Sequence, residues 1–174
     1  MQNLFLIGMM GSWKTTVGRK LANVMNMEFI DTDDAIEEVT EMKVSDIFRE
    51  FGEEKFREME TAFFTEKAKQ SDQVFSTGGG IVLDLVNREI LKNNGTTFFL
   101  NAKTHTLVNR MHDTSKRPLL INDKNLHVQL DKIWNERKLY YNDSAAHVID
   151  TDGLKPDEVL DEILNLLGSS IENH

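Results

Sequence analysis

A short run near the N-terminus combines glycine, lysine and threonine at the spacing of a phosphate-binding loop. The segment GMMGSWKT, residues 8–15, follows an apolar stretch and almost completes the pattern G-x-x-x-x-G-K-[ST]. In that pattern backbone N–H groups point at a phosphate, and the next helix presents its positive end to it. Lys14 would reach the terminal phosphates and Thr15 a magnesium ion. The predicted nucleotide site contains Gly8, Gly11, Ser12, Trp13, Lys14, Thr15 and Thr16.

Trp13 is the departure from this pattern, because it stands where the second glycine is expected. If the position requires a positive φ, tryptophan costs roughly 1 to 2 kcal/mol there. The indole could also fill phosphate space or turn the loop N–H groups out of alignment. The sequence therefore leaves open both a working nucleotide site and a loop in which nucleotide binding is weakened or lost.

Acidic residues follow the second apolar stretch, in Asp31-Thr32-Asp33-Asp34. Open α/β sheets bind their ligands at the carboxyl ends of the strands, which is where this segment falls. One carboxylate could hold magnesium through water, while another orients or deprotonates an acceptor hydroxyl. The alternative is that Asp33 or Thr32 only caps the following helix. Beside a phosphate loop, we favour the ligand role.

Three consecutive glycines, Gly78, Gly79 and Gly80, follow the third apolar stretch. They permit close approach of another group and expose backbone N–H groups, so we interpret them as a ligand contact and not as a loose turn. The irregular stretch 112–124 contains Arg117 before Pro118, and we interpret it as a lid. A guanidinium that closes over a transferring phosphate stabilises the charge on its oxygens.

Apolar segments alternate with amphipathic helical patterns, which predicts an α/β fold with a parallel sheet covered on both faces. The predicted strands are residues 4–7, 28–31, 73–76, 96–100 and 147–149. One predicted helix covers residues 14–25, and another begins near Lys155 with Pro156 in its first turn. The charged helical stretch 33–69 is too long for a simple crossover, so we interpret it as a substrate-binding insertion.

Composition narrows the classes of protein that remain. A chain of 174 residues fits one domain, and its net charge of −9 disfavours a nucleic-acid partner. The absence of cysteine excludes disulfides, thiolate catalysis and cysteine-based zinc sites. The N-terminus leads almost directly into the first predicted strand, so we expect no targeting or membrane-spanning segment. We expect a cytoplasmic protein that does not bind membranes.

Six segments, taken in order, resemble the shikimate kinase family over nearly the whole chain. They are GMMGSWKTTVG, DTDD, FGEEKFREME, STGGG, KRPLL and ERKLYY. The resemblance implies a nucleoside-monophosphate-kinase-like P-loop kinase, residues 1–174, with a five-stranded parallel sheet in the order 2-3-1-4-5. It also implies ATP-dependent phosphorylation of the 3-hydroxyl of shikimate, with Mg²⁺ as cofactor, and we expect a monomer.

The resemblance further implies a role for each matched position. Lys14, Asp33 and Arg117 would be catalytic, and Thr15 and Asp31 would hold magnesium. Asp33 would also bind the shikimate hydroxyls. The shikimate carboxylate would pair with Arg57 and Arg137, joined by the backbone of Gly78, Gly79 and Gly80. Arg117 would close over the phosphates, and Arg110 and Pro156 would flank adenine.

Two departures keep other functions open. Leu139 stands where the family has proline, which could loosen Arg137 modestly. Because of Trp13, the chain could instead be an impaired shikimate-binding or regulatory protein. A third possibility is a P-loop kinase of another small hydroxylated substrate such as gluconate, against which Arg57, Gly79 and Arg137 argue together.

Overall fold

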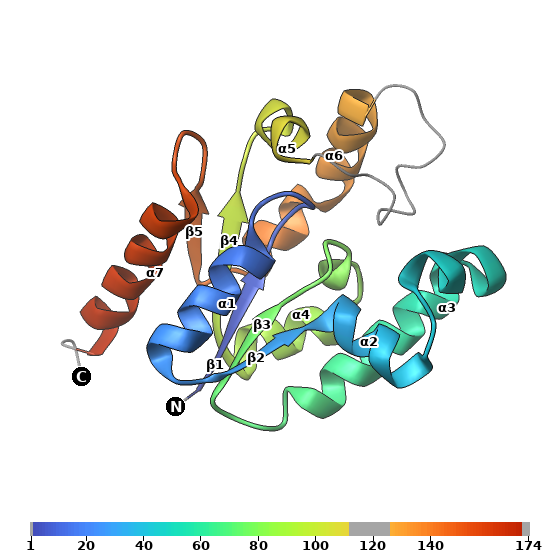
Figure 1. The fold of residues 1–174 in the computed structure, drawn as a ribbon, viewed down its shortest axis with the longest axis horizontal. Helices are drawn as coiled ribbons and strands as arrows, with labels where there is room; N and C mark the ends of the chain where they lie inside the picture. Colours follow the sequence, from blue (N-terminus) through green and yellow to red (C-terminus); the bar gives the residue numbers. More distant parts are fainter. Residues whose placement is uncertain (1, 112–125, 172–174) are drawn as a thin grey trace.

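The fold is a central sheet with helices on both sides (Figure 1). A computed structural model describes residues 2–111 and 126–171 of the chain. The predicted lid and Arg117 therefore lie outside the described residues. The elements are β1 (Asn3–Ile7), α1 (Lys14–Met25), β2 (Glu28–Asp31), α2 (Thr32–Thr40), α3 (Val44–Lys67), β3 (Gln73–Ser76), the 3-10 turn η1 (Ile81–Leu83), α4 (Leu85–Asn93), β4 (Gly95–Asn101), α5 (Thr104–Arg110), α6 (Leu126–Ser144), β5 (His147–Asp150) and α7 (Pro156–Ile171).

The five strands form one parallel sheet in the order β2-β3-β1-β4-β5, which confirms the predicted topology. The central strand β1 pairs with β3 and with β4, so that Leu6 lies between Ser76 and Phe98. Parallel neighbours need long crossover connections, and the helices between the strands supply them. All five strands therefore end at the same edge of the sheet.

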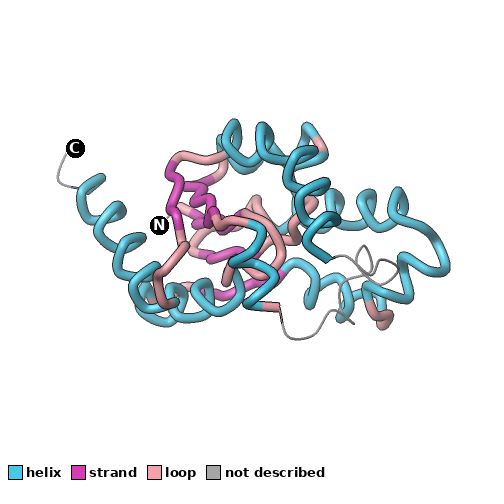
Figure 2. The backbone as a smooth tube through the Cα atoms, turned by 90° about the horizontal axis from the view of Figure 1, so that it is seen from above, coloured by secondary structure: helices cyan, strands magenta, loops and turns pink. Residues whose placement is uncertain are grey.

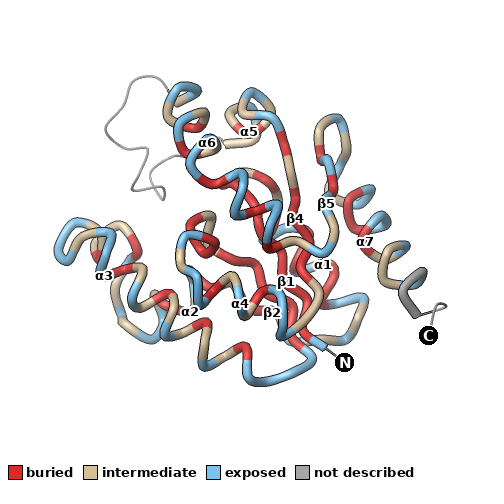
Figure 3. The backbone as a smooth tube through the Cα atoms, turned by 180° about the vertical axis from the view of Figure 1, so that it is seen from behind, coloured by how far each residue is buried: buried red, intermediate tan, exposed pale blue. Residues whose placement is uncertain are grey.

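Alternate residues of β1 face opposite sides of the sheet and enter separate hydrophobic cores. Phe5 and Ile7 belong to the core formed with α3, α4, α5 and α6, whereas Leu4 and Leu6 belong to the core formed with α1 and α7. Helices lie on both sides of the strands when the molecule is viewed from above (Figure 2). The strands β1 and β4 are buried along most of their length (Figure 3). This rigid support fixes the loops that follow the strands.

The strand order divides the carboxyl edge of the sheet into two halves, with the loop after β1 between them. We use "β2–β3 half" for residues 31–34 and 77–80 together with the α3 and α6 side chains packed against them. We use "β4–β5 half" for the end of α5, at Arg110, and the loop 151–155 after β5. Within the described ranges, no helix is long and apolar enough to cross a bilayer.

Candidate active site

The loop between β1 and α1 takes the strained backbone that a phosphate loop requires. Gly8 and Gly11 have φ angles of 146° and 78°. Trp13 also has a positive φ, of 73°, with ψ at 17°, and it is the N-cap residue of α1. Its carbonyl accepts a hydrogen bond from Val17 N at 2.9 Å. Trp13 therefore keeps a left-handed conformation that a glycine would adopt without strain.

The indole of Trp13 stacks on Arg110, at the end of α5. The guanidinium carbon of Arg110 lies 3.5 Å from the centre of a Trp13 ring, and the indole also packs against the core beneath α1 and α7. A cation–π contact contributes roughly 0.5 to 2 kcal/mol, comparable with the roughly 1 to 2 kcal/mol cost of the left-handed backbone. The contact therefore offsets the strain at Trp13.

Arg110 is held in place by the loop after β5. Its Nη1 donates to Thr151 Oγ1 at 2.9 Å and its Nη2 to the carbonyl of Thr151 at 2.6 Å. Burial lowers the pKa of Arg110, although the charge of Asp152 acts in the opposite direction. The β4–β5 half thus presents an arginine fixed by two hydrogen bonds and covered on one face by an indole.

Lys14 and Thr15 begin α1 next to the second strand. Lys14 is buried, and its Nζ donates to the carbonyl of Met9 at 2.8 Å. Thr15 Oγ1 donates to Asp31 Oδ2 at 2.8 Å and lies 3.1 Å from Ser76 Oγ. A hydroxyl and a carboxylate in contact beside a phosphate loop fit Mg²⁺, which takes one or two protein oxygens together with phosphate oxygens and water.

The acidic segment after β2 has a division of roles that the sequence did not predict. Asp31 caps α2, because its Oδ1 accepts from the backbone N–H groups of Asp33 and Asp34 at 3.2 and 3.4 Å. The capping alternative that assigned this role to Asp33 or Thr32 is therefore wrong. Thr32 Oγ1 instead accepts from Gly78 N at 2.9 Å, which joins the two loops of the β2–β3 half.

An open cleft of about 450 Å³ lies between the loop after β1 and the ends of β2 and β3. Its lining includes Trp13, Lys14, Thr15, Thr16, Asp31, Asp33, Gly78 and Gly79. The structure thus brings together Lys14, Thr15, Asp31 and Asp33, whereas the predicted acceptor residues Arg57, Gly80 and Arg137 lie outside this lining. Arg110 and Pro156 are not among the described residues that line this cleft. Trp13 forms its wall on the side of Arg110.

A buried cluster of charges lies behind the glycine run. Arg57 donates through Nη1 to Glu60 at 2.7 Å and through Nη2 to Glu53 at 3.3 Å. Glu60 is fully buried, and Arg137 on α6 is nearly so. Burial raises the pKa of Glu60, against the opposing charges of Arg57 and Arg137. Burial opposes the charged form of Arg57, but its two glutamate partners outweigh it and raise its pKa.

Gly78 and Gly80 are required by the protein's own side chains. A Cβ on Gly80 would lie 2.3 Å from the guanidinium carbon of Arg57. A Cβ on Gly78 would lie 2.7 Å from Glu60 Oε1 and 2.9 Å from Asp33 Oδ1. The sequence indicated close approach but did not identify what approaches. Any larger residue would push these charged groups away from the glycine run.

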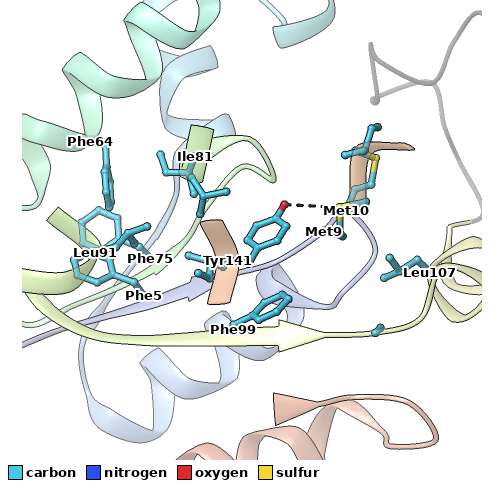
Figure 4. Packing of buried hydrophobic residues seen from close by; sticks show 14 of the residues in the cluster. Phe5, Met9, Met10, Phe64, Phe75, Ile81, Leu91, Phe99, Leu107 and Tyr141 are labelled. Atoms are coloured by element: carbon cyan, nitrogen blue, oxygen red, sulfur yellow. Dashed lines mark hydrogen bonds between the residues drawn. The ribbon is translucent and has the colours of Figure 1, made fainter. Parts of the chain in front are cut away.

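Glu60 and Tyr141 are site residues that we did not assign from the sequence. The hydroxyl of Tyr141 donates to the carbonyl of Gly79 and contacts Met9 Sδ, while its ring stacks on Phe99 (Figure 4). Burial raises the pKa of this phenol. Glu60 lies three residues after Arg57, and this helical spacing was the one available signal.

Leu139 is exposed on α6, two residues after the buried Arg137. Its side chain is 73% exposed, and α6 continues through it without interruption. Arg137 lies one half-turn earlier and is 3% exposed, so the helix itself fixes its position. The modest loosening of Arg137 that leucine led us to consider stays a prediction.

The fold and the cleft define a P-loop kinase of small molecules. A structure described as a gluconokinase from Sinorhizobium meliloti shares the fold, with a TM-score of 0.61 at 18% identity over 99% of this chain and 94% of that chain. A family model described as "Shikimate kinase" matches residues 10–168. The chain belongs to the shikimate kinase family.

Relatives of known name agree with this assignment over most of their length. The shikimate kinase of Thermodesulfovibrio yellowstonii is 38% identical over 164 residues, which cover 94% of each chain. A structure of the Acinetobacter baumannii shikimate kinase in complex with shikimate superposes with a TM-score of 0.94 at 34% identity. That match covers 98% of this chain and 94% of the other.

Proposed function

We propose that this chain transfers the terminal phosphoryl group of ATP to the 3-hydroxyl of shikimate. The observation that carries the proposal is the buried cluster behind the glycine run, where Arg57 pairs with Glu60 and with the partly exposed Glu53. Arg137, which is nearly fully buried, has no ion pair of its own among the described residues. Buried charge is stable only when it is paired, so the cluster favours an additional anion. The carboxylate of shikimate is such an anion, and guanidinium groups bind planar carboxylates through paired hydrogen bonds.

The cleft supports a division of labour for this reaction. Lys14 and the N–H groups of the loop would hold the phosphates, and Thr15 and Asp31 would hold Mg²⁺, which neutralises phosphate charge when bound. Asp33 would orient or deprotonate the attacking hydroxyl. Catalysis would then rest on positioning and charge stabilisation, without a covalent intermediate on the protein.

The remaining assignments are also part of the proposal. Arg57 and Arg137 would hold the substrate carboxylate with the backbone of Gly79 and Gly80, while the N–H of Gly78 is engaged with Thr32. Arg117 would close over the phosphates. The absence of cysteine is compatible with a cytoplasmic monomer. Neither the cleft nor the comparisons favour the gluconate or regulatory alternatives.

The decisive experiment is to measure ADP formation with ATP and Mg²⁺ in the presence of shikimate, shikimate methyl ester, gluconate or no acceptor. We expect turnover that depends on shikimate and falls about 100-fold with the neutral ester, because the ester no longer pairs with the buried arginines. Equal turnover with shikimate and its ester would show that the reaction does not depend on the buried arginines. Turnover with gluconate alone would replace the proposed acceptor.

A further inference from the structure

We infer that Trp13 determines donor specificity, because its indole screens Arg110 from the cleft and leaves the phosphate chain as the main part of the donor that the protein recognises. This inference rests on the proposed function and concerns the donor side of the same site. It implies a kinase that discriminates little between nucleobases.

The first observation is that Trp13 lies between the cleft and Arg110. The indole lines the cleft on one side and stacks on the guanidinium of Arg110 on the other. Of the described residues, Trp13 lines the cleft at this end and Arg110 does not. A ligand in the cleft therefore meets an indole where the guanidinium would otherwise be accessible.

The sheet order carries the second step. Acceptor residues after β2 and β3 lie on one side of the phosphate loop, and Arg110 and Thr151 lie on the other side. With phosphates at Lys14 and an acceptor at Asp33, the nucleoside must extend towards the β4–β5 half. Trp13 stands at the start of that path.

The hydrogen bonds of Arg110 carry the third step. An arginine recognises a flat ring through its planar face and through its edge N–H groups. In this chain Trp13 covers one face of Arg110, and two edge N–H groups donate to Thr151. The face of Arg110 that remains open is the one turned away from the indole that lines the cleft, whereas the loop N–H groups and Lys14 recognise any phosphate chain.

Binding measurements without an acceptor test this inference apart from catalysis. Calorimetry with Mg²⁺ should give dissociation constants for ATP, GTP, CTP and inorganic tripolyphosphate within about threefold of one another. In Trp13→Gly, which uncovers Arg110, ATP should bind about tenfold more tightly than tripolyphosphate. The matched control is Tyr140→Leu, which removes the aromatic partner of Arg88 on α6 and should leave the four affinities close together.

Each result that contradicts the inference would indicate where the base binds or what Trp13 blocks. A tenfold or greater preference for ATP in the intact chain would overturn the inference. If that preference disappeared in Trp13→Gly, the indole would itself be the base platform. If it remained, the base would bind elsewhere. Failure of all four ligands to bind the intact chain would show that Trp13 blocks the phosphates as well.

Tryptophan emission gives a second test that does not depend on how Trp13→Gly folds. The chain has two tryptophans, so Trp134→Phe leaves Trp13 as the single emitter. We expect ATP and tripolyphosphate to change its emission equally. A change produced by ATP alone would place the base against the indole and overturn the inference. Failure of the proposed function would appear instead as absence of shikimate-dependent turnover.

Discussion

The two halves of the sheet edge are built on different physical principles. In the β2–β3 half, Arg57 and Glu60 are packed against Gly80 and Gly78, which leave no room for a side chain, and the nearly fully buried Arg137 lies beside Gly79. In the β4–β5 half, one arginine, Arg110, is covered by one strained residue of the loop after β1, Trp13. The first arrangement is fixed by many mutually dependent contacts, whereas the second consists of one stacked pair and two hydrogen bonds to Thr151. We therefore expect substitutions to be far more damaging in the first half than in the second.

The largest effect should come from Lys14, which lies between the two halves, because turnover requires the phosphates that this residue would hold. Lys14→Ala removes the buried ammonium from the phosphate loop, and we expect turnover to fall about 10³-fold. Shikimate binding without nucleotide should change little, since its residues lie in the β2–β3 half. Lys20→Ala, on the exposed side of the same helix, is the control and should retain activity. Comparable losses of turnover in Lys14→Ala and Lys20→Ala would show that Lys14 has no specific role in the reaction.

Arg57→Ala should separate the two halves most clearly. Truncating one member of a buried charge pair costs about 2 to 5 kcal/mol, so we expect shikimate binding to weaken about 100-fold. ATP binding should change less than about threefold because no charge is lost in the other half. Calorimetry with each ligand measures both values. Arg49→Ala, an exposed arginine of α3, is the matched control, and equal losses of the two ligands in Arg57→Ala would contradict the division.

Trp13→Gly should have a modest effect on stability. Glycine relieves a left-handed strain of about 1 to 2 kcal/mol but loses a cation–π contact of about 0.5 to 2 kcal/mol. We expect the free energy of unfolding in urea to change by less than about 2 kcal/mol. Phe64→Ala, in the core beneath the β2–β3 half, should lose about 3 to 5 kcal/mol. A similar loss in the two variants would show that Trp13 supports the fold and not only the cleft.

The smallest effect should follow Leu139→Ala. The leucine is exposed on α6 and leaves Arg137 buried, so we expect the KM for shikimate to change less than about twofold. Tyr141→Phe, two residues further along the same helix, removes the hydroxyl that reaches Gly79 and should weaken shikimate about fivefold. The reverse order of these two effects would mean that the outer face of α6 contributes to the substrate site.

The strands and the loops at their ends could be predicted from sequence because both signals are local. The ranges 28–31 and 73–76 agree with β2 and β3, and the predicted strand 96–100 falls short of β4 by one residue at each end. Contacts within the site were harder to predict. Tyr141 and Gly79 are 62 positions apart, and neither residue type indicates the other. The stacking of Trp13 on Arg110 likewise depends on the sheet order, which brings the ends of β1 and β4 together.

Asp31 connects the nucleotide loop to the first turn of α2 through its two carboxylate oxygens. One of its oxygens accepts from Thr15, at the nucleotide loop, while the other accepts from the backbone amides of Asp33 and Asp34, at the start of α2. A redistribution of electron density on this carboxylate must change the magnetic environment of those two amides. The amide chemical shifts of Asp33 and Asp34 therefore report ligand binding at Thr15, with no probe group and no substitution introduced into the cleft.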